Sequence, residues 1–110
     1  LTIGNGEMRS ERIDPLDFEI KRAPISALVG GDATENARIT MAIFAGEKGA
    51  PRDAVVLNAA AAIAAYEARF DLNLHQRMAL GISRAVDAID SGAATHLVSK
   101  WAELTQKLRA

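Results

Sequence analysis

The apolar run from Ala54 to Tyr66 constrains the fold of this chain more than any other feature. It covers thirteen residues, is interrupted only by Asn58, and consists largely of alanine. A membrane-spanning helix needs about 20 consecutive apolar residues, so this run is too short to cross a bilayer. A helix that is apolar on every side is instead surrounded by protein. We therefore predict a helix from Pro51 to about Ala68 that is covered on all sides and lies at the centre of the assembly.

Sequence patterns predict further helices on both sides of this one. Over residues 32–46, Asp32 and Glu35 have the spacing of a capping box, and Gly46 supplies the end. Residues 73–90 begin with Asn73 and Gln76 at the same spacing. Ser91 is then predicted to cap a last helix with an apolar stripe at positions i, i+3, i+4 and i+7.

The N-terminal residues predict a hairpin. Asn5-Gly6 is a typical two-residue hairpin turn, because both positions tolerate positive φ, and it separates the predicted strands Thr2–Ile3 and Glu7–Ile13. Asp14-Pro15 ends the second strand and begins a short helix that reaches Phe18. We predict one unit, residues 1–110, that is mainly α-helical with a short N-terminal β-hairpin.

Charge and cysteine content exclude several classes of partner. Thirteen basic and fourteen acidic residues give a net charge of −1, so no electrostatic footprint favours nucleic acid or an anionic membrane. The chain has no cysteine and therefore no disulfide framework or thiolate metal site, as is typical of a reducing compartment. We expect a cytoplasmic protein that binds neither nucleic acid nor membrane.

The start of the helix at Asp32 is the first candidate for chemistry. Gly30-Gly31 before a helix is compatible with phosphate binding, because a helix N-terminus presents free N–H groups. Asp32 and Glu35 would occupy those donors and repel a phosphate, and neither a Walker pattern nor GxGxxG is present. The two carboxylates could also hold Mg²⁺ together with water and substrate phosphate. We favour a structural turn and cap over both alternatives.

Five other residues are functional candidates, and each also has a structural interpretation. Asn36 and Asn58 have apolar neighbours and are the polar residues expected to be buried, where each amide needs hydrogen-bond partners. His75 and His96 lack a second histidine or an acid at a spacing that defines a metal site or a triad. Trp101 ends an apolar stripe, which is typical of core or interface. The sequence therefore favours packing roles for Asn36, Asn58 and Trp101, and surface positions for the two histidines.

Several blocks in the same order resemble the C-terminal part of the anthranilate phosphoribosyltransferase family. The shared segments are Gly6-Glu7, Asp14–Phe18, Gly30–Ala37, Ala45–Gly49, Asp53–Ala62 and Ala88–Ala93. The resemblance implies that residues 1–110 are the C-terminal part of the large α/β domain, without the N-terminal helical domain and the upstream catalytic half. It also implies that this part contains terminal strands and helices that cover the sheet.

The family transfers a phosphoribosyl group from phosphoribosyl pyrophosphate to anthranilate in tryptophan biosynthesis, with Mg²⁺ as cofactor. Its glycine-rich diphosphate loop, its Lys-His-Gly-Asn segment and its Mg²⁺-binding Asp-Glu pair all lie upstream of the matched part. The resemblance therefore implies no catalytic, substrate-binding or metal residue here, and a segment that is inactive alone. The implied partners are the two substrates, the remainder of the same enzyme and a second copy in a homodimer. The alternative is a non-enzymatic binding module related to the same family.

Overall fold

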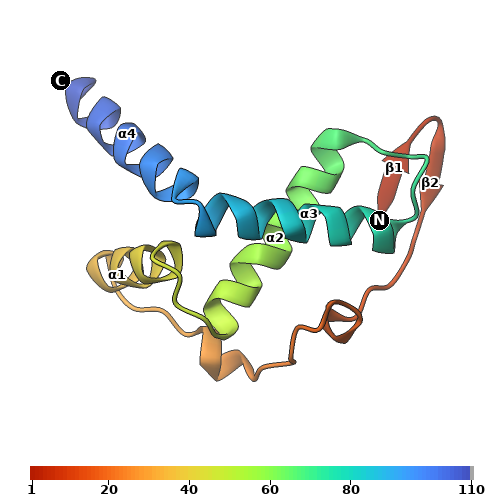
Figure 1. Ribbon diagram of the computed structural model, residues 1–110, viewed down its shortest axis with the longest axis horizontal. Helices are drawn as coiled ribbons and strands as arrows, with labels where there is room; N and C mark the ends of the chain where they lie inside the picture. Colours follow the sequence, from red (N-terminus) through yellow and green to blue (C-terminus); the bar gives the residue numbers. More distant parts are fainter. Residues whose placement is uncertain (110) are drawn as a thin grey trace.

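The computed structural model describes residues 1–109, which contain a two-stranded sheet and four α-helices (Figure 1). The predicted fold, mainly helical with a short N-terminal hairpin, is confirmed. The elements in chain order are β1 (Thr2–Gly4), β2 (Glu7–Arg9), the 3-10 helices η1 (Pro15–Phe18) and η2 (Ile25–Leu28), and the α-helices α1 (Ala33–Phe44), α2 (Ala50–Glu67), α3 (Leu74–Asp90) and α4 (Ala93–Lys107).

Strands β1 and β2 pair antiparallel, with Thr2 opposite Arg9 and Gly4 opposite Glu7. The turn has positive φ at both central positions, 50° at Asn5 and 75° at Gly6, as the Asn-Gly pair predicts. The predicted extension of the second strand to Ile13 is wrong. Strand β1 offers only three residues for pairing, so the residues after Arg9 have no partner strand.

The centre of the molecule is the crossing of α2 over α3 (Figure 1). Gly81 of α3 lies against Ala60 of α2, so closely that a Cβ atom at Gly81 would stand 2.4 Å from the Ala60 carbonyl oxygen. The missing side chain of Gly81 thus sets how near the two helices approach. Around this crossing, the buried hydrophobic residues are Ile43, Val56, Ala60, Ala64, Met78, Ala85 and Ile89.

Helix α2 has nearly the predicted bounds, and within residues 1–109 it is covered on one side. Its cover on all sides in the whole assembly stays a prediction. One face, which carries Val56, Ala60 and Ala64, is buried against α3. The opposite face is open to solvent, and Tyr66 on it is 92% exposed. The described chain supplies one long partner helix, which can bury only one side of a helix that is apolar all round.

Helix α4 extends away from the other helices towards the C-terminus (Figure 1). Gly92 is its N-cap, with φ 83°, so the predicted cap at Ser91 is displaced by one residue; the Ser91 Oγ still accepts a hydrogen bond from the Ala93 N–H at 3.3 Å. The predicted apolar stripe is present but uncovered. Trp101, predicted to lie in a core or an interface, is 67% exposed and so lies outside the core of residues 1–109, while the interface alternative stays a prediction. Within residues 1–109, no helix combines the length and the apolar character that crossing a membrane requires.

Candidate functional site

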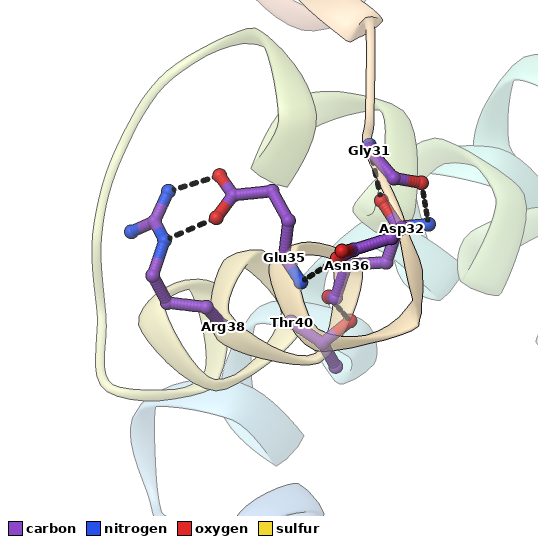
Figure 2. A network of polar contacts seen from close by, with 6 residues as sticks. All are labelled: Gly31, Asp32, Glu35, Asn36, Arg38 and Thr40. Atoms are coloured by element: carbon purple, nitrogen blue, oxygen red, sulfur yellow. Dashed lines mark hydrogen bonds and ion pairs between the residues drawn. The ribbon is translucent and has the colours of Figure 1, made fainter.

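A network of hydrogen bonds surrounds the N-terminus of α1 (Figure 2). Asp32 is the N-cap, and its Oδ1 accepts from the Glu35 N–H at 2.9 Å. The Asn36 side chain closes a ring with Gly31: its Oδ1 accepts from the Gly31 N–H and its Nδ2 donates to the Gly31 carbonyl, both at 2.9 Å. Thr40 donates to the Asn36 carbonyl at 2.9 Å. The network ties the connection before α1 to the first turn of the helix.

Gly30 makes this close approach possible. A Cβ atom at Gly30 would stand 2.3 Å from the Asn36 Oδ1, so any side chain there would displace the amide from Gly31. The Gly-Gly pair is therefore explained by the packing of Asn36. No bound anion is needed to account for it.

Glu35 does not complete the predicted capping box. Its carboxylate faces the Arg38 guanidinium, with Oε2 accepting from Nε at 2.9 Å and Oε1 from Nη2 at 2.7 Å (Figure 2). The hydrogen bond from Arg38 lowers the pKa of Glu35 from its ordinary value. A two-pronged bond to a guanidinium satisfies the carboxylate better than one backbone N–H, which explains why Glu35 turns away from the cap.

The network leaves little for an anion or a metal ion to bind. Asp32 and Asn36 hold the Glu35 and Gly31 N–H groups, and Glu35 is engaged by Arg38. Within the described residues, no cluster of three or more histidine, cysteine or acidic side chains could hold a metal ion. These contacts favour the structural interpretation of Asp32 and Glu35. Asp32 and Glu35 therefore do not form a site that fits Mg²⁺.

The other predicted candidates lie on separate elements. The prediction that Asn36 and Asn58 are buried is wrong, since both are exposed; Asn58 lies on the open side of α2 and donates to the Ala54 carbonyl at 2.8 Å. His75, at the start of α3, is exposed and stacks on the Phe18 ring with centroids 4.6 Å apart. His96 is exposed on α4. The structure does not bring these residues together.

Two buried arginines were missed from the sequence. Arg52 is 4% exposed and donates through Nη2 to the Asp90 Oδ1 at 2.8 Å. Arg77 is 7% exposed and donates through Nη2 to the Ala64 carbonyl at 2.9 Å. These bonds join the start of α2 to the end of α3, and the start of α3 to the end of α2.

A signal for both arginines was present in the sequence. Arg52 begins a four-residue spacing through Val56, Ala60 and Ala64, and Arg77 begins the same spacing through Gly81, Ala85 and Ile89. Residues four apart lie on the same face of a helix. The two arginines are therefore on the faces that α2 and α3 turn towards each other.

The helices of the segment expose apolar faces, and the polar network at the start of α1 joins the Gly31 connection to the helix. Residues 1–95 match the family described as "Glycosyl transferase family, a/b domain". The chain belongs to this family of glycosyl transferases.

The curated relatives are similar over nearly the whole chain. The anthranilate phosphoribosyltransferase of Rhodococcus jostii (strain RHA1) is 45% identical over 106 residues, which is 96% of this chain and 29% of that protein. The enzyme of the same name from Mycolicibacterium smegmatis is 47% identical over 107 residues, 96% of this chain and 29% of that protein. The one from Nocardia farcinica is 43% identical over 111 residues, 96% and 32%. The predicted resemblance is confirmed, and the chain spans less than a third of the length of these relatives.

Proposed function

We propose that this chain is the C-terminal segment of an anthranilate phosphoribosyltransferase and supports the reaction without performing it. In that reaction the amine of anthranilate forms a bond to C1 of the ribose, and the bond from C1 to pyrophosphate breaks. The substrates, the Mg²⁺ ion and the catalytic residues belong to the upstream part of the polypeptide in this proposal. The full-length protein would be a cytoplasmic homodimer that pairs mainly through its N-terminal helical domain.

The open face of α2 carries the proposal. The matched family is an α/β domain, whereas the only sheet among residues 1–109 is the two-stranded hairpin. The open side of α2 includes Val55, Ala62 and Tyr66, and next to it lies a groove between η2, α1 and α2 that Leu28, Ile39 and Val55 line. Helices on a sheet bury their apolar side against it. We infer that the main sheet, formed by the upstream part, covers this face.

The role of the segment is therefore to hold the sheet of the catalytic part in place. The buried α2–α3 pair gives α2 a fixed position, and the open side of α2 then presents a preformed apolar surface. No residue of the segment is assigned to catalysis, to substrate or to a metal ion.

The proposal is tested on the full-length protein that contains this chain. Phosphoribosyl transfer is followed by the loss of anthranilate fluorescence on addition of phosphoribosyl pyrophosphate and Mg²⁺. We expect activity in the wild type, and loss of both folding and activity in Ala62→Asp, because the new carboxylate would be buried without a partner. Ser83→Asp on the exposed side of α3 is the matched control and should stay active.

Two results would contradict the proposal. If the full-length protein folds but leaves anthranilate unchanged, the enzyme hypothesis is wrong, and the alternative of a non-enzymatic binding module of the same family is favoured. An Ala62→Asp variant as stable and active as the wild type would show that the sheet does not cover α2 at this face.

A further inference from the structure

A small cavity lies between the β-hairpin and the connection from α2 to α3. Its volume is about 130 Å³, and its walls include Thr2, Asn5, Phe70 and Arg77. Gly4 of the hairpin rests against the Phe70 ring, where a Cβ atom would be only 2.0 Å from the nearest ring carbon. The Arg77 guanidinium lies over the same ring, with Cζ 5.1 Å from the centroid. The Phe70 ring thus contacts both the hairpin and Arg77, and all three line the cavity.

Arg77 is a buried cation without an anion. Its Nη2 donates to the Ala64 carbonyl at 2.9 Å, but its Nε is buried and has no hydrogen-bond partner. Among residues 1–109, no carboxylate lies within ion-pair distance of this guanidinium. The last carbonyls of α2 and the Phe70 ring carry only partial negative charge. Buried charges in proteins are normally paired, so Arg77 lacks the partner that its position requires.

Arg52 differs from Arg77 in its carboxylate partner, although its Nη1 is likewise buried without a hydrogen-bond partner. Arg52 is buried to the same degree and is paired with the Asp90 carboxylate at 2.8 Å. The two arginines have equivalent places at opposite ends of the α2–α3 pair. Among residues 1–109, the Arg77 end of the pair has a cavity beside the guanidinium where the Arg52 end has a carboxylate.

The remaining charged groups on the cavity wall are Arg9, Glu7 and Glu11. Arg9 and Glu7 neutralise each other through hydrogen bonds of 2.6 and 3.2 Å. Glu11 is exposed and makes no ion pair in the described part of the chain. Thr2 and Asn5 add polar side chains to the wall. We propose that this cavity binds a small oxyanion, a carboxylate or a phosphate group, with Arg77 as its main ligand.

The test uses the full-length protein and measures its thermal unfolding midpoint in potassium phosphate, in potassium acetate and in potassium chloride of equal ionic strength. A ligand that binds only the folded state raises the midpoint. We expect an anion-specific rise in the wild type and its loss in Arg77→Gln. Glu11→Gln should increase the rise, because it removes a negative charge from the cavity wall. Arg12→Gln, an exposed neighbour outside the cavity, is the matched control and should respond like the wild type.

A substrate site elsewhere in the full-length protein contributes the same shift to every variant, so the differences between variants report this cavity. A response to acetate alone would identify the ligand as a carboxylate, and a response to phosphate would identify a phosphoryl group. The proposal is overturned if Arg77→Gln keeps the wild-type rise. It is also overturned if the wild type shows no anion-specific rise and Glu11→Gln gains one, since Glu11 would then be the natural counter-ion of Arg77. Because Glu11 is exposed, that variant keeps the test decisive even if Arg77→Gln does not fold.

Discussion

The α2–α3 pair and α4 are all α-helical, but they differ in how much of their apolar surface is packed within this chain. The pair has a glycine at its crossing and a buried arginine at each end, Arg52 bonded to Asp90 and Arg77 bonded to Ala64. Helix α4 contacts α3 and α1 near its start and exposes its apolar stripe, including Trp101 and Leu104. Most helical stability in proteins comes from packing of an apolar face. The pair therefore obtains its stability within this chain, whereas the described residues leave most of the α4 stripe exposed.

Gly81→Val in the full-length protein should break the pair at its crossing. The new side chain would meet the Ala60 carbonyl oxygen and Cα, at 2.4 and 2.9 Å from its Cβ, and backbone atoms cannot turn aside as a flexible side chain does. We expect a loss of at least about 3 kcal/mol in the free energy of unfolding, the upper part of the range for overpacked cores. Urea denaturation measures it. Ser83→Val on the exposed side of α3 is the control, and an equal loss there would show that helix propensity, not the crossing, is responsible.

Asp90→Asn should remove the ion pair with Arg52 at one end of the α2–α3 pair. It leaves the Arg52 guanidinium buried without an anion, which costs about 3 kcal/mol. Arg52→Met should cost less, because the Asp90 side chain that it leaves behind is 43% exposed and can be hydrated. Urea denaturation of both single variants and of the double variant gives the coupling energy. If the two single variants lose the same unfolding free energy, the different burial of Arg52 and Asp90 does not determine the cost of breaking this ion pair.

The elements were predictable where short-range rules decide them. The Asn5-Gly6 turn and the Asn73 and Gln76 capping pair are confirmed, because turns and caps depend on a few neighbouring residues. The cover of α2 was not predictable in this way. An all-round apolar helix predicts cover in the complete protein, but the pattern does not say which part of the polypeptide supplies it.

Leu104→Ala should show whether α4 is packed in the full-length protein. Leu104 is 52% exposed in this segment, yet the upstream part is expected to cover the stripe. We therefore predict a loss of about 2 kcal/mol, the lower end for a buried leucine. Lys100→Ala, off the stripe, should change the unfolding free energy by no more than about 0.5 kcal/mol. If the two variants behave alike in urea denaturation, α4 is uncovered in the full-length protein as well.

The candidate site was predicted in part. The cap at Asp32 is confirmed because its geometry is local, while the turn of Glu35 towards Arg38 depends on a competition between two partners that spacing alone does not settle. The two buried arginines were missed because arginine is normally exposed. Their four-residue spacing to apolar and small residues was the available signal, and it requires knowing that α2 and α3 pack together.

The smallest predicted effect concerns Asp14, the N-cap of η1. The hydrogen bond from Arg22, and then the one from the Leu16 N–H, lower the pKa of Asp14 from its ordinary value of 3.8. A carboxyl group with a lowered pKa in the folded state stabilises that state above the unfolded pKa, and the stabilisation is lost as the pH falls through the folded value. Asp14→Asn should therefore flatten the dependence of the unfolding free energy on pH below about 4. Glu103→Gln, on α4, is the control and should keep the wild-type slope. Because Asp14 and Arg22 are at the surface, added salt should weaken the difference. A pH dependence of Asp14→Asn identical to that of the wild type at low salt would show that this ion pair does not stabilise the N-terminal segment.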